Sequence, residues 1–440
     1  MKFCIHVFLL FFSLTGIVSA QNLILTPEES INISFKNSND LNISRSRIAG
    51  SKEKISEVKS QFLPQLKLNA GYLRQSNVDP YFIIIPFSPQ PVQLSEVILN
   101  NYSVVLSLRQ TLFSGGKLLS LRDLAQFTSE STEQDFNAAQ NDLAATVLNA
   151  YWNYYKALQI KKTTDEIVLQ TDQHIIDTKN FMINGLATRS DVLKLEVQNS
   201  NAKLQQLESE NNIELARVSF NKILGLSLDS KTNIDPGELK FESENLDLNS
   251  LSANAFENRA ELKSLEYRIK ASDENISAIK SAYYPYVSLY GNFYYQNPNL
   301  RIQPPVDEFN STWDVGVSLS WDLWNWGNTS SQVRQAEETS KQGKFSLDQL
   351  KDNISLEVNQ NYLNVIYLEE RIKVSRKNVE LAEDSYKVIT EKYNVQLATS
   401  TEITDAETSL FQAKTNYITS VVDYKIALIK LYRSTGKKLY

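Results

Sequence analysis

Residues 104–225 begin VVLSLRQTLF and end FNKILG, and they return as residues 315–436, which begin VGVSLSWDLW and end LYRSTG. The offset between the copies stays at 211 residues, so the Leu-Ala-Thr triplet at 186–188 meets the same triplet at 397–399. Upstream, residues 55–60 match 276–281 at an offset of 221, which makes the intervening loop ten residues longer in the first copy. One register over so long a stretch indicates a duplicated unit.

The sequence of each copy predicts the same order of elements, which is a strand, a loop, a second strand, a very long helix, a tight turn and a long helix. The first repeat covers 21–250, with an N-terminal helix, strands near 65–76 and 102–112, a helical hairpin over 117–225 turning at 184–190, and a connector over 226–250. The second covers 251–440, with a helix to about 284, strands near 286–296 and 313–323, and a hairpin over 328–436 turning at 394–401.

Residues 1–20 are typical of a secretory signal peptide. Lys2 supplies the charged start, residues 3–14 are apolar, and Val18-Ser19-Ala20 is a small-residue cleavage site. The alternative is a transmembrane anchor, but the apolar run is short beside the ~20 residues that a helical span needs.

Loss of residues 1–20 would also remove Cys4 and His6, and it would change the formal net charge from −6 to −7 because Lys2 is lost. The mature chain would then contain no cysteine and a single histidine, His174. This composition excludes disulfides and thiolate metal sites, and the acidic balance gives no reason to expect nucleic acid as a partner.

Apolar and polar side chains alternate in residues 102–112 and again in 313–323. In the first stretch Val104, Leu106 and Leu108 point to one side, and serine and arginine side chains between them point to the other. Alternation with a period of two gives a strand one apolar face and one wet face. Strands of about 9–11 residues cross a bilayer when they are tilted. Together with their partners, these stretches predict four transmembrane strands in each chain.

Aromatic residues gather near the expected strands. Rings that carry an N–H or O–H group concentrate at membrane interfaces, because the ring is apolar and its polar group binds water. The alternative is the edge of a soluble β-sandwich. The candidate membrane-interface aromatics are Tyr72, Phe293, Trp313, Trp321, Trp324 and Trp326.

Two stretches, 117–184 and 344–435, contain neither glycine nor proline. At ~1.5 Å per residue, a helix over the first would be on the order of 100 Å long, which is more than a compact domain needs. In the second, apolar and tyrosine side chains recur every seven residues from Val358 to Tyr393. Heptads of this kind predict helices packed side by side as a coiled coil.

Four strands in lipid cannot remain an open sheet, because the unpaired edges would have no water to bind. The smallest bilayer barrels have about eight strands, so the barrel must be shared between copies of the chain. Two copies of four strands would give eight and three copies would give twelve. With the apolar side facing outward, the enclosed side is polar and forms a pore.

No catalytic constellation is present, so we expect that the protein is not an enzyme and needs no cofactor or metal. No nucleophile pairs with a base, no glycine-rich phosphate loop occurs, and Gly115-Gly116 is a turn. His174 lies within a predicted helix among polar residues, which favours a solvated or packing role.

The whole pattern resembles the TolC family of outer-membrane efflux and secretion channels: a signal peptide, then two copies of a strand pair with a long helical hairpin that turns at a Gly-Leu-Ala-Thr-like tip. The resemblance implies a mixed α/β membrane protein and a homotrimer. Its twelve-stranded β-barrel would lie in the outer membrane, and its coiled-coil helices would form an α-barrel in the periplasm. It also implies a passive duct that docks onto a periplasmic adaptor protein and an inner-membrane pump of the RND, ABC or MFS type. Cargo, adaptor and pump class are left open.

The resemblance also places a periplasmic gate. Glu402 and Asp405 lie where the family can place acidic rings, and Asp191 and Tyr393 lie where members can make a closing contact between the hairpins. The second turn has Ala398 where an arginine is expected, and Arg189 stands in the first turn instead. The alternative for the acidic residues is that each is a helix N-terminal acid favoured by the helix dipole.

The turns themselves match the family's adaptor-contact tips, with ordinary turn chemistry as the alternative. The matching residues are Gly185, Leu186, Gln396 and Leu397. A different function, that of a periplasmic or surface coiled-coil scaffold or adhesin, would account for the helices but not for the alternating strands. The sequence therefore predicts an outer-membrane export channel.

Overall fold

The computed structural model describes residues 23–87, 89–93, 96–235 and 241–440. The expected signal peptide and Pro236-Gly237 of the connector lie outside this part of the chain. The chain divides into two compact units, one formed by Met1–Asn39, Gln140–Asn258 and Leu356–Tyr440, the other by Asp40–Ala139 and Arg259–Ser355. The longest helices contribute residues to both units, and each unit is described separately below.

The chain starts with a short strand, β1 (Leu23–Leu25), followed by α1 (Pro27–Asn37) and α2 (Asn39–Ser60). The side chain of Thr26 accepts a hydrogen bond from the backbone of Glu29, whose carboxylate accepts one from the backbone of Thr26. This capping box fixes the start of α1, as the sequence Thr-Pro-Glu-Glu predicts. The predicted N-terminal helix consists of two helices, because Ser38 has extended backbone angles and separates α1 from α2.

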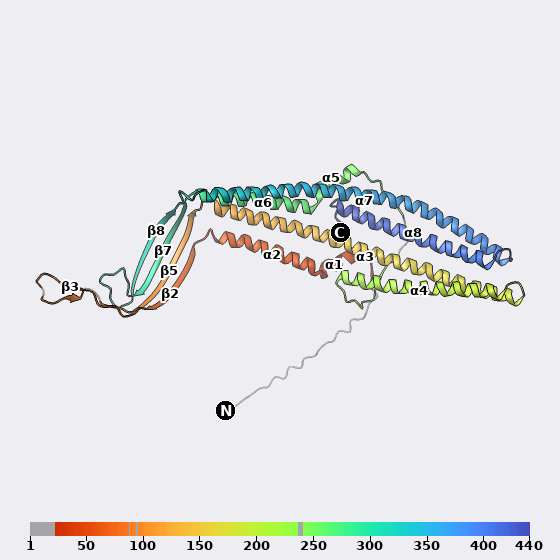
Figure 1. Ribbon diagram of the computed structural model, residues 1–440, viewed down its shortest axis with the longest axis horizontal. Coiled ribbons are helices and arrows are strands. Elements are labelled where there is room, and N and C mark those ends of the chain that lie inside the picture. The colour runs from red at the N-terminus through yellow and green to blue at the C-terminus, as the bar shows by residue number, and fades with distance from the viewer. Residues whose placement is uncertain (1–22, 88, 94–95, 236–240) are drawn as a thin grey trace, which may run out of the picture. The chain divides into compact units, whose positions relative to one another are not determined.

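A four-stranded antiparallel sheet dominates one end of the second unit (Figure 1). The strand order is β2-β5-β7-β8, so β2 and β8 are the edges and each has a single neighbour. A small hairpin of β3 (Phe82–Ile83) and β4 (Val92–Gln93) lies in the longer loop. The sheet strands are β2 (Gln65–Arg74), β5 (Asn100–Phe113), β7 (Tyr286–Asn297) and β8 (Asn310–Ser320).

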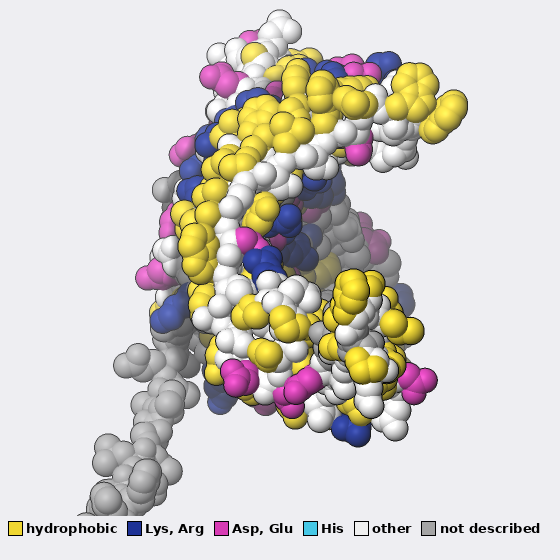
Figure 2. Space-filling model, turned by 90° about the vertical axis from the view of Figure 1, so that its left-hand side faces the viewer, with side chains coloured by type: hydrophobic (Ala, Val, Ile, Leu, Met, Phe, Trp, Pro, Cys, Tyr) yellow, Lys and Arg dark blue, Asp and Glu magenta, His cyan; other side chains and the backbone are white. Residues whose placement is uncertain are grey.

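The register of the sheet aligns apolar side chains across all four strands. Leu68 pairs with Leu106, Leu106 with Phe293, and Phe293 with Trp313. All four side chains are exposed, up to 71% for Trp313. Figure 2 shows hydrophobic side chains gathered in a curved band along one side of the sheet. The sheet therefore has one continuous apolar face that nothing in the described part of the chain covers.

The opposite face of the sheet is polar at the same level. Lys67 pairs with Ser107, Ser107 with Asn292, and Asn292 with Asp314. The amide of Asn292 donates to the Asp314 carboxylate at 2.8 Å, and Arg301 forms an ion pair with the same carboxylate. Polar side chains thus bind one another across neighbouring strands on this face.

The rest of the second unit is helical and attaches to the sheet. It includes almost all of α2 and the whole of α6 (Ala260–Lys280), which ends in a short 3₁₀ turn (Ser281–Tyr283). Arg268 binds Asp135 at 2.6 Å, and the hydroxyls of Ser264 and Ser131 lie 3.0 Å apart. The expected single helix up to about residue 284 is wrong, because Arg259 has extended backbone angles and separates α6 from the preceding α5 (Leu248–Asn258).

Two helical hairpins form the remainder of the chain (Figure 1). In each, a helix of 67 residues is followed by one of 36 or 35 residues. Among the described residues, no helix has both the length and the apolar character that a membrane span requires. The helices are α3 (Lys117–Ile183) with α4 (Arg189–Leu224), and α7 (Asn328–Asn394) with α8 (Ser400–Ser434).

The core of the first unit lies among these helices. Phe220 and Tyr424 are fully buried, and the heptad positions Val365 and Ile372 of α7 face inward. In the connector, β6 (Thr232–Ile234) pairs in parallel with β1. The hydroxyl of Tyr154 on α3 donates to the backbone of Thr232 at 3.0 Å. These contacts fix the N-terminal strand and the connector against the hairpins.

Candidate functional site

The two hairpin turns lie in the first unit and have the same backbone geometry. Gly185 has φ +73° and Gln396, 211 positions later, has φ +66°. The amides of Leu186 and Leu397, which follow these two residues, donate to carbonyls five residues earlier, at 2.9 and 2.8 Å. These are the bonds of a Schellman-type helix end, in which one residue must be left-handed. The leucine side chains of both turns are exposed, to 59% and 77%.

A capping box starts the helix that follows each turn. Thr188 caps α4 with Asp191, and Thr399 caps α8 with Glu402. Hydrogen bonds from the Thr188 hydroxyl and from the Ser400 hydroxyl lower the pKa of Asp191. The backbone N–H of Thr399 lowers the pKa of Glu402. Both carboxylates therefore stay charged at neutral pH and complete a helix start, the alternative that the sequence left open.

Asp191 and Tyr393 each connect the two hairpins, but they use different partners. The Ser400 hydroxyl at the start of α8 donates to Oδ1 of Asp191 at 2.7 Å. The hydroxyl of Tyr393 on α7 forms a short hydrogen bond with the hydroxyl of Thr178 on α3. Burial raises the pKa of Tyr393, so this phenol keeps its proton. The two bonds join α4 to α8 and α3 to α7 close to the turns.

The other predicted gate residues are at the surface of the single chain. Asp405 lies in an open groove between α7 and α8, which Leu381 and Gln412 also line. Glu402 is exposed apart from its capping bonds. Arg189 is exposed as the first residue of α4 and makes no ion pair within the described part of the chain. The structure therefore brings Asp191 and Tyr393 into contact with the opposite hairpin and leaves Arg189, Glu402 and Asp405 facing outward.

A buried pair that the sequence did not single out lies between the same hairpins. His174 of α3 is 5% exposed and Glu407 of α8 is 1% exposed. Oε1 of the carboxylate is 3.1 Å from Nε2 of the imidazole. Of the two roles that the sequence allowed for His174, solvated or packing, the structure therefore shows the packing role. The repeat aligns His174 with Ser385, so no motif in the sequence relates it to residue 407.

The aromatic residues proposed for the membrane interface are all exposed in the single chain. Trp321 lies directly after β8 rather than within it, and its indole N–H donates to the backbone of Tyr283 at 3.2 Å. Trp324 and Trp326 pack edge to face with centroids 5.7 Å apart. The expected strand up to residue 323 is thus three residues too long, and the final tryptophans lie on the turn that leads into α7.

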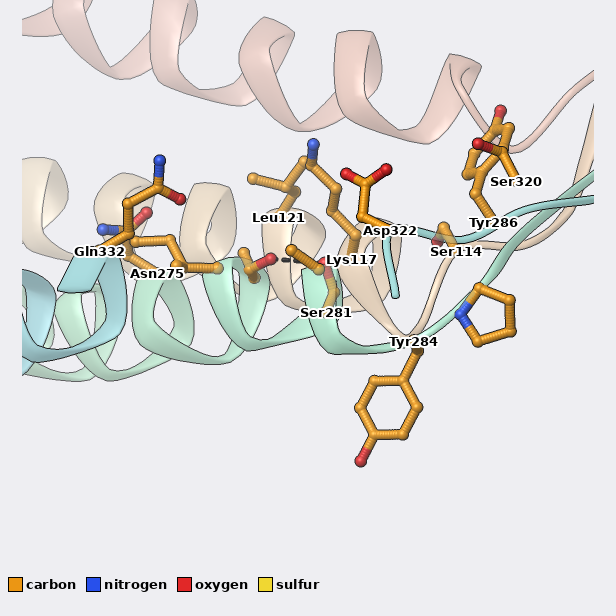
Figure 3. A pocket seen from close by; sticks show the side chains of 14 residues that line it. Ser114, Lys117, Leu121, Asn275, Ser281, Tyr284, Tyr286, Ser320, Asp322 and Gln332 are labelled. Carbon is orange, nitrogen blue, oxygen red and sulfur yellow. Dashed lines mark hydrogen bonds between the residues drawn. The ribbon is translucent and has the colours of Figure 1, made fainter. Parts of the chain in front are cut away.

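A pocket of about 410 Å³ lies where the strands meet the helices in the second unit (Figure 3). Lys117 and Asp322 point to the same side of it, and Tyr284 points away. The pocket contains no nucleophile with an adjacent base. Within the described residues, no group of three histidine, cysteine or carboxylate side chains could hold a metal ion.

The sequence matches the family model for outer membrane efflux proteins over residues 31–226 and 251–437. It is 21% identical to the outer membrane protein TolC of Vibrio cholerae over 87% of this chain and 84% of that protein. It is also 21% identical to the probable efflux pump outer membrane protein TtgC of Pseudomonas putida, over 74% of this chain and 66% of TtgC. The structure superposes on the crystal structure of the outer membrane protein VceC of Vibrio cholerae with a TM-score of 0.75, at 17% identity, covering 94% of this chain and 97% of VceC.

The family match covers both hairpins and their strands, and the structural match covers almost the whole chain. The prediction of a TolC-like export channel in the outer membrane is confirmed by these matches, and the family is one of transport proteins rather than enzymes. The chain belongs to the outer membrane efflux protein family, and it is an outer-membrane efflux channel protein of the TolC type.

Proposed function

We propose that three copies of this chain form one channel, with twelve strands closed into a barrel in the outer membrane. One observation carries the proposal: a four-stranded sheet with a continuous apolar face and two unpaired edges, β2 and β8. Open edges cannot persist in lipid, because their backbone N–H and C=O groups would have no partner. Pairing β8 of one copy with β2 of the next removes every edge and turns the apolar face toward lipid.

The helices continue the duct into the periplasm in this proposal. Both hairpins have a 67-residue first helix and a second helix of similar length, which supports the origin of the chain by duplication. Four long helices from each of three chains would enclose a tunnel. The aromatic residues at the strand ends, Tyr72, Phe293, Trp313, Trp321, Trp324 and Trp326, would lie at the membrane interfaces.

The hairpin turns form the periplasmic entrance in this proposal. A periplasmic adaptor protein would contact the turns at Gly185, Leu186, Gln396 and Leu397. The two leucines would supply exposed apolar side chains for this contact. The relative TtgC is described as part of an efflux pump, which supports a tripartite assembly with an inner-membrane pump. The duct itself would be passive. A scaffold or adhesin is disfavoured, because it leaves the apolar face of the sheet in water.

The gate consists of the contacts between the hairpins together with the outward-facing acids. Asp191 and Tyr393 hold the hairpins together, and Arg189 lies beside them at the start of α4. Glu402 and Asp405 from three chains would place six carboxylates around a narrow opening. Such a ring favours cations and repels anions.

Single-channel recording in planar bilayers tests this proposal. We expect discrete conductance steps with cation selectivity. Replacement of both ring residues, Glu402→Ala with Asp405→Ala, should reduce the cation selectivity, and the discrete conductance steps should remain. The matched control is Glu370→Ala with Lys373→Ala. This exposed ion pair lies on α7, further from the turn, and its replacement leaves the net charge unchanged. Unchanged ion selectivity would contradict the ring, and absence of any conductance would contradict the channel.

A further inference from the structure

The loop between β7 and β8, residues 298–309, folds back onto the polar face of the sheet. β7 runs away from the helices of its unit and β8 returns toward them, so the loop lies at the far end of the sheet (Figure 1). Loops between strands often project into solvent. In this loop, Asn299 and Arg301 instead bind side chains of β8. The first half of the loop is therefore fixed against the sheet.

Asn299 makes the first attachment. The residue is 1% exposed, and its side-chain N–H groups donate to the carbonyl of Asn310 and to the hydroxyl of Thr312, both at 3.1 Å. Its side-chain oxygen accepts a hydrogen bond from the backbone N–H of Arg301, also at 3.1 Å. A buried amide with these groups paired fixes the backbone of the loop beside the start of β8.

Arg301 makes the second attachment, further along the strand. Its guanidinium forms an ion pair with the carboxylate of Asp314, and the guanidinium carbon lies 4.1 Å from the centroid of the Tyr294 ring. The same carboxylate accepts a hydrogen bond from the Asn292 amide at 2.8 Å. A lone ion pair at a surface contributes little, but a planar guanidinium that pairs with an oriented carboxylate and stacks on a ring is held more firmly.

Both attachments lie on the polar face. Thr312 and Asp314 flank Trp313, whose side chain belongs to the apolar row, and Tyr294 pairs with Thr312. Successive strand residues point to opposite faces, so these partners point away from the apolar row. Asp314 lies four residues after the start of β8. At ~3.4 Å per residue this is about 14 Å along the strand, so Arg301 reaches well past the end of the sheet.

The second half of the loop returns to the apolar face. The ring of Phe309 packs against the rings of Tyr102 and Tyr295, with centroids 5.7 and 5.1 Å away. Tyr295 pairs with Val104, and Tyr102 is two residues before Val104, so both rings belong to the apolar face. The loop thus passes over the end of the sheet with attachments on both faces, and its first half is held on the polar side.

We propose that residues 298–309 form a size-limiting constriction at the outer opening of the channel, with Arg301 as the positioning residue that holds the loop inside the pore. The inference rests on the proposed function, because the polar face encloses a pore only when three copies close the barrel. In that barrel the three loops extend from the outer end toward the same axis. They limit the width of exported molecules, whereas the acidic residues at the hairpin turns act on their charge.

The effect of Arg301 on the loop has to be separated from the effect of its charge in the pore. Arg109 provides the comparison, because it pairs with Tyr290 on the central strands β5 and β7 and is exposed on the same polar face. Replacement of either arginine by alanine removes one positive charge from the polar face of each copy. Replacement of Arg301 also removes an attachment of the loop.

The test is the exclusion of neutral polyethylene glycols of graded size from single channels in planar bilayers. A polymer that enters the pore lowers its conductance, so the largest polymer with this effect reports the width of the opening on the side to which it is added. With polymers on the side of the loops, we expect Arg301→Ala to shift this size limit toward larger polymers and to increase the conductance without polymer. Arg109→Ala should keep the size limit of the unmodified chain.

A charge reversal tests the ion pair itself. Arg301→Asp alone and Asp314→Arg alone place like charges opposite each other, so each should release the loop and raise the size limit. The double variant restores an ion pair with the charges exchanged, and it should return the size limit toward that of the unmodified chain. A size limit in the double variant as large as in the single variants would overturn the role of this contact.

An equal size limit in the unmodified chain and in Arg301→Ala would overturn the constriction, and so would an equal shift in Arg301→Ala and Arg109→Ala. Both arginine side chains are exposed, so their replacement should leave folding intact. If the unmodified chain gives no conductance steps, the channel itself is contradicted. That outcome is distinct from a conducting channel whose size limit does not depend on Arg301.

Discussion

At the scale of single residues, the backbone at the turns is more alike in the two copies than the side chains are. Gly185 and Gln396 share a left-handed conformation that suits glycine and strains other residues. Apart from residue 185 itself and its two chain neighbours, no heavy atom lies within 4 Å of the position that a Cβ at residue 185 would take. Any cost of a side chain there therefore comes from the backbone alone.

This comparison predicts opposite effects for two substitutions. Gly185→Ala should weaken the first turn by about 1 kcal/mol, because alanine resists a positive φ. Gln396→Gly should leave the second turn unchanged or slightly more stable, since relief of backbone strain offsets the greater freedom of the unfolded chain. Hydrogen exchange at the amides of Leu186 and Leu397 measures both effects. Faster exchange at Leu397 in Gln396→Gly would contradict the strain argument.

Single residues also show what the sequence could predict. The capping box at Thr26 and the helix starts at Thr188 and Thr399 were predictable, because their partners are three residues away. The bonds of Tyr393 with Thr178 and of His174 with Glu407 join residues more than 200 positions apart. They depend on the relative register of two hairpins, which the heptad pattern of one helix does not determine.

At the scale of elements, periodicity predicted which faces are apolar. Alternation in residues 102–112 and 313–323 corresponds to the apolar row through Leu106 and Trp313. The heptads of α7 place Val358, Val365 and Ile372 in the core. The sequence did not predict the helix breaks at Ser38 and Arg259, because neither residue is a glycine or a proline.

The bridge between α4 and α8 predicts a way to hold the hairpins closed. The Ser400 hydroxyl and the Asp191 carboxylate are 2.7 Å apart, and the sequence contains a single cysteine, Cys4, which lies in the predicted signal peptide. The double variant Asp191→Cys with Ser400→Cys should form a disulfide on oxidation and lower the single-channel conductance, with recovery after reduction. Each single cysteine variant is the control. Full conductance in the oxidised double variant would show that these helices do not separate when the channel opens.

At the scale of the whole molecule, one chain supplies only part of the proposed barrel. Its sheet exposes a continuous apolar face on one side and polar side chains such as Lys67 and Asp314 on the other. The sequence predicted this division but not how many chains share the barrel, because alternation is the same for eight strands as for twelve. In the proposed channel, the edges β2 and β8 are where neighbouring copies pair.

The mass of the detergent-extracted protein, measured by native mass spectrometry, tests the central claim most directly. Three chains of four strands should give a complex of three times the mass of one chain, stable at detergent concentrations that disrupt weak association. The sheet edges would then pair between copies. A monomer that remains stable in detergent would contradict the shared barrel, because four strands with two open edges cannot enclose a pore.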